Sequence, residues 1–241
     1  MPAETFIPPE ETGAIEAPKF SEFFEDCYVR FAHVLIDKTK DGSAVLDIGC
    51  GAGSAERLMA PYVKNCTITG VDSDEAALHQ FQRDQTARLE AGDNHARLVC
   101  EDANDFLDSA NISGQDTLIL NATLHEINDP NDRENYLRSL FSNMQRIVAL
   151  GGKVVIGDYY YEDSVTDEEV ERFMVYQKSK IGHADARHKF VKPPEILPIA
   201  KEFGFVVGSE GVQIMQAVKK EQIDRKYYLI CLENIGRKNG E

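Results

Sequence analysis

Basic residues are scarce in this sequence, and their scarcity limits the partners that we expect. Lysine and arginine together number 26, against 41 aspartates and glutamates, for a formal net charge of −15 at pH 7. Binding to nucleic acids draws on clustered positive charge, and so does binding to anionic lipid surfaces. We therefore expect neither nucleic acid nor a membrane as a partner, and the acidity itself favours solubility.

Long apolar segments are scarce as well. No run in the sequence approaches the roughly 20 apolar residues that span a bilayer. Residues 1–18 are rich in Pro, Glu and Ala, show no hydrophobic periodicity and do not combine a basic start with an apolar stretch. We expect a cytoplasmic protein with a flexible tail over residues 1–18 and a single domain over residues 19–241.

Cysteine is infrequent, and its distribution argues against two kinds of site. The 5 cysteines include no CxxC pair, so we expect neither a disulfide framework nor a zinc site. We also predict no metal, because helix capping and solvation explain the acids Asp158, Glu162 and Asp163 equally well. Three cysteines in or beside apolar runs are expected to be core residues in a reducing compartment: Cys66, Cys100 and Cys231.

What the sequence does contain is an alternation of short apolar runs with helical patterns. Such runs, separated by helices, predict an α/β fold with a parallel sheet covered on both faces. Two further runs close the chain, at residues 204–210 and 226–234, and are expected to pair as a hairpin. The five earlier strand-like runs are residues 43–49, 66–72, 96–102, 116–122 and 153–161.

Two segments stand outside this alternation. Apolar residues recur at three- and four-residue spacing over residues 20–37, which predicts a helix that packs on the core. The same helix is a candidate lid over a bound ligand, with Tyr28 facing that ligand. Residues 160–195, which include the capping box Thr166-x-x-Glu169, are predicted to form either a substrate cap or a solvated loop. The residues expected to bind the substrate are Tyr159, His183, Arg187 and His188.

A glycine-rich segment, VLDIGCGAG at residues 45–53, joins the first strand to its helix. Glycines at such a point let a helix N-terminus approach a ligand closely, although they also suit a plain tight turn. The third glycine of the dinucleotide pattern G-x-G-x-x-G is missing, since Ser54 and Glu56 stand in its place, so NAD is disfavoured. Asp47 would repel a pyrophosphate but suits a ligand that carries an ammonium and a sulfonium group.

Acids also stand at the ends of the second and third strands. Asp72 is placed to accept hydrogen bonds from ribose hydroxyls, and Asp102 from the amino group of adenine. Both have a simpler explanation as helix N-caps. The fourth strand ends in the segment Asn121-Ala122-Thr123-Leu124-His125-Glu126. Because parallel strands end at the same edge of a sheet, these groups are expected to lie together.

These four motifs, in this order, resemble those of class I S-adenosylmethionine-dependent methyltransferases. The resemblance implies a doubly wound, seven-stranded, mostly parallel sheet with the last strand antiparallel and helices on both faces. It also implies S-adenosylmethionine as the methyl donor and S-adenosylhomocysteine as the product. The residues expected to hold the donor are Tyr28, Asp47, Gly49, Gly51, Gly53, Asp72, Ser73, Asp102, Ala103 and Asn121.

Transfer of a methyl group to a small molecule is the function that follows, with O-, N- and C-methylation all left open. His125 is the candidate general base, since His titrates near neutrality, and a purely structural histidine is the alternative. Glu126 is expected either to orient His125 or to be solvated. The segment NATL differs from the Pro-Pro-aromatic pattern of enzymes that methylate nucleobase amino groups.

Two other functions remain open on the same fold. An aminopropyl transferase would use a decarboxylated donor and would require more acids near the acceptor than Glu126 alone. A sensing or scaffolding protein would keep the donor site without turnover. The aromatic residues of the added segments also suggest a homodimer, because exposed apolar patches mark interfaces.

Overall fold

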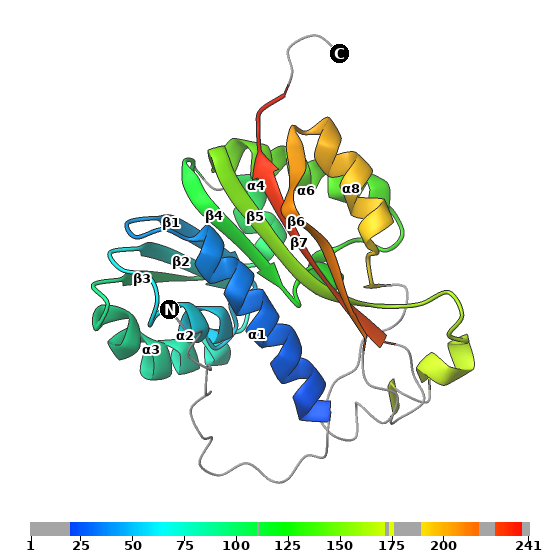
Figure 1. Ribbon diagram of the computed structural model, residues 1–241, viewed down its shortest axis with the longest axis horizontal. Helices are drawn as coiled ribbons and strands as arrows, with labels where there is room; N and C mark the ends of the chain where they lie inside the picture. Colours follow the sequence, from blue (N-terminus) through cyan, green and yellow to red (C-terminus); the bar gives the residue numbers. More distant parts are fainter. Residues whose placement is uncertain (1–19, 110, 172–173, 176–188, 217–224, 238–241) are drawn as a thin grey trace.

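In the computed structural model, seven strands form one sheet in the order β3-β2-β1-β4-β5-β7-β6 (Figure 1). The structure describes residues 20–109, 111–171, 174–175, 189–216 and 225–237. β7 runs antiparallel to both of its neighbours, while β1 to β5 pair in parallel, so the predicted sheet is confirmed. The strands are β1 Ala44–Ile48, β2 Thr67–Asp72, β3 His95–Cys100, β4 Gln115–Asn121, β5 Val148–Tyr161, β6 Phe205–Gln216 and β7 Arg225–Asn234.

Helices cover both faces of the sheet, as the alternation of elements predicts. α1, α2 and α3 lie on one face, and α4, α6 and α8 lie on the other (Figure 1). The short helix α5 follows β4 directly at the edge where the parallel strands end. The helices are α1 Phe20–Lys38, α2 Ser54–Met59, α3 Glu75–Glu90, α4 Ala103–Ser109, α5 Leu124–Ile127, α6 Arg133–Ile147 and α8 Pro193–Glu202.

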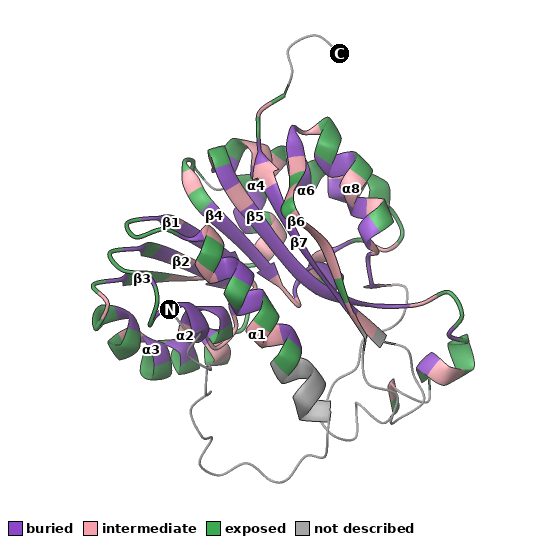
Figure 2. Cartoon of the chain, viewed as in Figure 1, coloured by how far each residue is buried: buried purple, intermediate pink, exposed green. Residues whose placement is uncertain are grey.

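Burial is deepest in the central strands and weakest at the β3 edge (Figure 2). β4 and β5 are covered on both faces, so their apolar runs need no alternation with polar residues. Cys66 and Cys231 are buried as predicted, whereas Cys100 is exposed. The prediction for Cys100 is wrong because it ends an edge strand, which has a neighbour on one side only.

The N-terminal helix packs on the sheet through the face that the sequence pattern indicates. Cys27, Phe31 and Leu35 are buried, and α1 contacts α2, β5 and β7. The side chains of residues 20–25 lie outside the described part of the structure. Core packing of this helix is thus confirmed for its described side chains, and its service as a lid stays a prediction.

The segment predicted as a cap, residues 160–195, begins within β5 and ends within α8. Tyr160 and Tyr161 continue β5, where they pair with Lys226 and Arg225 of β7. These tyrosines are buried, so they do not supply the exposed aromatic surface from which we expected a homodimer. A few residues further along the segment, Thr166 and Glu169 form the predicted capping box through reciprocal hydrogen bonds of 2.8 and 3.3 Å. At its other end, residues 193–195 begin α8.

Candidate active site

A cleft of about 370 Å³ lies at the edge where β1 to β4 end. Five residues that we predicted to hold the donor line it: Gly49, Asp72, Ser73, Asp102 and Ala103. Its wall also includes Asn104, Ala122, Thr123, Glu126 and Ile127. The cleft therefore joins the glycine loop to the segment that follows β4.

The glycine loop takes a shape that other residues would strain. Gly49, Gly51 and Gly53 have φ angles of 73, 52 and 79°, in the left-handed region that favours glycine. A Cβ atom on Gly49 would lie 2.4 Å from Oγ1 of Thr123, and one on Gly53 would lie 2.6 Å from the ring of Phe81. The loop is thus a tight turn and, through Gly49, also part of the cleft wall.

Asp72 braces this loop. One of its carboxylate oxygens accepts a 2.8 Å hydrogen bond from the Gly51 N–H, and the other accepts a 2.8 Å bond from the Asp74 N–H. The N-cap of α3 is Asp74, which accepts from Ala76 and Ala77, so the N-cap alternative for Asp72 is wrong. A carboxylate has about four acceptor positions, which leaves Asp72 capacity for ribose hydroxyls.

Asp102 serves the start of α4 as well as the cleft. One of its oxygens accepts from the backbone N–H groups of Asn104 and Asp105, at 2.8 and 3.3 Å. The capping alternative is therefore correct for this residue. Asp102 also lines the cleft, so capping and ligand binding are compatible here.

Two carboxyl groups are buried beside the glycine loop. Asp47 is 2% exposed and Glu56 is 0% exposed. Burial raises the pKa of Asp47 well above its ordinary value, and the charges of Glu56 and Asp72 add to the shift. Burial raises the pKa of Tyr28 of α1 too, and the charge of Asp47 is the next cause. Glu56 was not among the predicted site residues; the signal in the sequence was an acid in the helix that follows the glycine loop.

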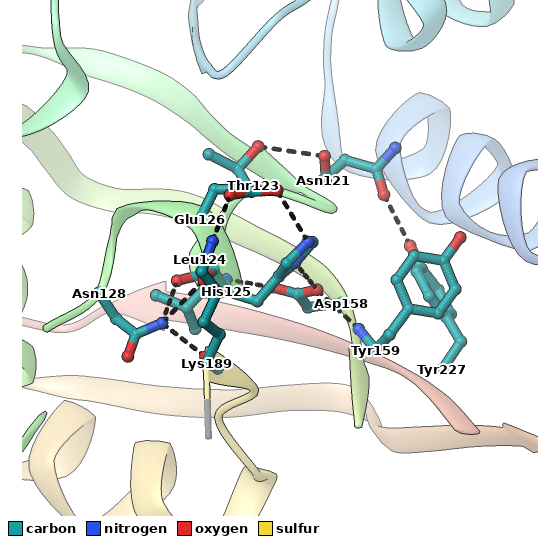
Figure 3. Close-up of polar contacts among 10 residues, drawn as sticks. All are labelled: Asn121, Thr123, Leu124, His125, Glu126, Asn128, Asp158, Tyr159, Lys189 and Tyr227. Atoms are coloured by element: carbon teal, nitrogen blue, oxygen red, sulfur yellow. Dashed lines mark hydrogen bonds and ion pairs between the residues drawn. The ribbon is translucent and has the colours of Figure 1, made fainter. Parts of the chain in front are cut away.

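On the other side of the cleft, His125 is buried and held by a carboxylate (Figure 3). Its Nδ1 lies 2.7 Å from Oδ1 of Asp158, and its backbone N–H donates to the other oxygen of Asp158 at 2.9 Å. The ring of Phe190 stacks on the imidazole with centroids 5.0 Å apart. This histidine is thus fixed both in position and in the plane of its ring.

From the sequence, helix capping and solvation explained Asp158; it does accept from a backbone N–H at the start of α5, but it is not solvated. Its side chain is 1% exposed, at the end of the β5 region that lies beside β4. The parallel register sets Asn121 of β4 opposite Gly157 of β5, which brings Asp158 beside the segment with His125. Its place just past the fifth strand's apolar run was the only sequence signal.

Glu126 lies where the buried histidine meets the cleft. Its Oε1 is 3.6 Å from Nε2 of His125, which is longer than a hydrogen bond. Its other oxygen pairs with Nζ of Lys189 at 3.2 Å. The amide of Asn128 donates to the carbonyl of Lys189 at 2.6 Å, so the end of the predicted cap segment is held against α5.

Tyrosines from two strands adjoin this group (Figure 3). The hydroxyl of Tyr227 donates to Oδ1 of Asn121 at 2.8 Å, and its ring meets that of Tyr159 edge to face at 5.1 Å. Both tyrosines are buried, so Tyr159 is a packing partner here and does not line the cleft. Gly157 makes room for this contact, because a Cβ atom there would lie 1.8 Å from the Tyr227 hydroxyl.

Several predicted site residues are not on the wall of the cleft. Asp47, Gly51, Gly53, Asn121 and Tyr28 are not among its lining residues. Of these, Gly51 contacts the wall through its hydrogen bond to Asp72. His183, Arg187 and His188 lie outside the described residues. Within the described part of the chain, no group of three or more His, Cys, Asp or Glu side chains is arranged to hold a metal ion.

A protein family described as "Methyltransferase domain" matches residues 39–222. The chain therefore belongs to this family and has the fold of its class I, S-adenosylmethionine-dependent members. The resemblance given by the four motifs is confirmed.

Two relatives of known activity match parts of the chain. Carboxy-S-adenosyl-L-methionine synthase of Campylobacter fetus is 26% identical over 160 residues, which are 66% of this chain and 63% of that protein. Pavine N-methyltransferase of Thalictrum flavum is 31% identical over 67 residues, which are 28% of this chain and 18% of that protein. The chain spans less than two thirds of the length of either relative.

Two solved structures share the fold over nearly the whole chain. The N-methyltransferase NodS of Bradyrhizobium japonicum has a TM-score of 0.58 at 19% identity, covering 88% of this chain and 97% of its own. Magnesium protoporphyrin IX methyltransferase of Synechocystis, solved with bound S-adenosylhomocysteine, has a TM-score of 0.61 at 14% identity, covering 94% and 90%. At these identities the likeness shows the fold alone.

Proposed function

We propose that this protein is an enzyme that transfers the methyl group of S-adenosylmethionine to a small molecule. The observation that carries the proposal is the cleft at the carboxyl edge of the sheet, where Asp72 and Asp102 stand beside the glycine loop. Open α/β sheets bind ligands at this edge. Two acids suit the hydroxyl and amino donors of an adenosine better than they suit a pyrophosphate.

The residues present fit the donor. Asp72 and Ser73 would hold its ribose, Asp102 and Ala103 its adenine, and the loop with Gly49, Gly51 and Gly53 its amino-acid part. Oδ1 of Asp47 is buried and has no hydrogen-bond partner among the described residues, as expected of a group that meets a ligand cation. When bound, S-adenosylmethionine supplies a methyl group on a positively charged sulfur, which makes the methyl carbon electrophilic.

We place the pocket for the methyl acceptor between the end of β4 and a cap made by α1 and residues 160–195. His125 acts as the general base there, and Lys189 and Phe190, at the end of the cap segment, already contact this region. Tyr28 and α1 would cover the donor. Tyr159, His183, Arg187 and His188 stay candidates for substrate binding, the last three in the part of the chain that is not described.

Two further features of the proposal concern the surroundings of the enzyme. We place it in the cytoplasm, because the cysteines of the sequence are scattered and include no CxxC pair, which suits a reducing compartment. No helix in the described residues is both long and apolar enough to cross a bilayer. We keep the homodimer as a proposal that light scattering would test, with a monomer as the contradicting result.

Calorimetry with the purified full chain tests the donor. We expect S-adenosylmethionine and S-adenosylhomocysteine to bind and NAD not to bind. Binding of NAD alone would overturn the proposal.

Incubation with a small-molecule extract and a donor labelled in its methyl group tests turnover. We expect label in an extracted small molecule and S-adenosylhomocysteine as the second product. Donor binding with no transfer would favour a sensing protein, and turnover of decarboxylated donor alone would favour an aminopropyl transferase.

A further inference from the structure

The contacts of Asp158 distinguish it from an ordinary buried acid. Its two oxygens accept from three N–H groups: the backbone of His125 at 2.9 Å, the backbone of Tyr159 at 2.7 Å, and Nδ1 of His125 at 2.7 Å when that nitrogen carries the proton. Both oxygens face donors, so no amide side chain could satisfy all three. A neutral side chain of the same shape is therefore not equivalent at this position.

Burial strengthens the interaction between Asp158 and His125. Asp158 is 1% exposed and the His125 side chain is 5% exposed, so neither group is well hydrated. A buried carboxylate is costly unless it is paired and hydrogen-bonded. Proton uptake by His125 would supply the opposite charge at 2.7 Å, so the carboxylate stabilises the imidazolium.

The same contact selects the tautomer of the neutral ring. An ionised Asp158 can only accept, so Nδ1 must donate and the lone pair of the ring falls on Nε2. Nε2 lies toward Glu126, which lines the cleft. Phe190 stacks on the imidazole and fixes the plane of its ring.

We propose that Asp158 is the positioning residue of His125, and that the methyl acceptor is a protic nucleophile, a hydroxyl or amine group that loses its proton during transfer. This inference rests on the proposed function. The acceptor's lone pair forms the bond to the methyl carbon while the carbon–sulfur pair stays on sulfur. The acceptor's proton passes to Nε2, and the resulting imidazolium faces the Asp158 carboxylate.

Other charged and titratable groups face this pair from the elements around it. Glu126 of α5 lies 3.6 Å from Nε2 and is itself paired with Lys189, which precedes α8. From β7, Tyr227 and Tyr228 are buried beside Asp158. Burial raises the pKa of both tyrosine hydroxyls, with the charge of Asp158 among the further causes, so both remain neutral near pH 7.

A simpler alternative is that Asp158 only ties β5 to α5, since its bond to the backbone of His125 anchors the start of that helix. The Asp158→Asn variant separates the two, because lost anchoring lowers stability without dictating a tautomer. Nitrogen-15 NMR of the full chain with labelled histidine reports the tautomer directly, with His125→Gln to assign the signal. We expect the Nδ1–H form in the wild type and a shift toward the Nε2–H form in Asp158→Asn.

Kinetics with an acceptor identified in the extract supply the second readout. In Asp158→Asn, we expect turnover to fall by up to about 10⁴-fold, the effect of replacing by its amide a carboxylate that sets the tautomer of a general-base histidine. The acid limb of its pH–rate profile should move to lower pH, since the carboxylate no longer favours the imidazolium. Asp84→Asn, which removes an exposed carboxylate of α3, is the matched control and should change neither readout.

Two results would overturn the inference: an Nε2–H tautomer in the wild type, or an acid limb that stays in place in Asp158→Asn. An acceptor with no proton to lose would overturn the assignment of its class. Failure of the proposed function is distinct, because it appears as absent donor binding or absent methyl transfer in the wild type. The NMR experiment needs neither donor nor acceptor.

Discussion

The two halves of the sheet edge are built in different ways. At the donor half, Asp72 and Asp102 accept hydrogen bonds from backbone N–H groups of the loops and helices that follow their own or a neighbouring strand. Both acids remain accessible on the wall of the cleft. At the acceptor half, His125 and Asp158 are buried and meet as side chains across 33 residues of sequence.

This difference separates two tasks. The donor half offers fixed loop backbone and, in Asp72 and Asp102, accessible carboxylates, which suit reversible binding of a polar nucleoside. The acceptor half offers an oriented imidazole in a dry setting, where electrostatic interactions are stronger than in water. Changes in the donor half should therefore act on affinity, and changes in the acceptor half on turnover.

The largest expected effect comes from His125. In His125→Asn, the amide can still reach Asp158 but is not a base, so turnover should fall by about 10²–10⁴-fold. Donor affinity should stay close to that of the wild type. Steady-state kinetics measure the turnover and calorimetry measures the donor affinity. The control is His79→Asn, on the exposed face of α3. Unchanged turnover would make catalysis a matter of alignment alone.

Asp72 should show the opposite behaviour. Asp72→Ala removes the expected acceptor of the ribose hydroxyls and the brace of Gly51, which should weaken donor binding by roughly 1–3 kcal/mol. Turnover at saturating donor should be nearly retained. Titration of S-adenosylhomocysteine measures the first effect, and equal affinity in wild type and variant would remove Asp72 from the site.

Substitution of Gly157 tests the close contact between β5 and the Tyr227 hydroxyl. In Gly157→Ala the new methyl group would lie 1.8 Å from the Tyr227 hydroxyl, so overpacking should cost about 1–3 kcal/mol of stability. Tyr227→Phe removes that hydroxyl, so the double variant should lose less than the sum of the two single variants. Thermal unfolding measures the three variants, and additive losses would contradict the contact.

The smallest effect concerns the buried acids of the donor half. Burial raises the pKa of both Asp47 and Glu56 in the folded chain, above their ordinary values of 3.8 and 4.5. The folded state therefore binds protons more tightly than the unfolded state, and stability is lost as pH rises above those ordinary values. Glu56→Gln should weaken this loss, so the variant gains stability relative to the wild type as pH increases.

Thermal unfolding of the unliganded chain from about pH 5 to pH 8 tests this sign. A difference of 1 kcal/mol would shift the melting temperature by about 2–4 °C in a domain of this size. Glu90→Gln, at the exposed end of α3, controls for the loss of one charge. A constant difference between Glu56→Gln and the wild type across this range would contradict the buried pair.

The sequence by itself determined the order of strands and helices and most of the donor half. Apolar runs, the glycine loop and an acid at a strand end are local patterns in the sequence. Once the strands are parallel, their carboxyl ends meet at one edge of the sheet whatever the details of the packing. The same locality explains why the capping alternative holds for Asp102 and fails for Asp72. Whether Asp72 or Asp74 caps α3 depends on loop geometry over two residues.

Only the tertiary structure decided the acceptor half. The register of β4 against β5, with Asn121 opposite Gly157, brings His125 and Asp158 together, and Tyr227 meets Asn121 from 106 residues away. Neither contact can be read from a periodic pattern in the sequence, because each depends on which strands become neighbours and on their register. Burial then changes the chemistry of the same side chains: a carboxylate that is solvated in an open loop becomes, next to a buried imidazole, a partner that fixes its tautomer.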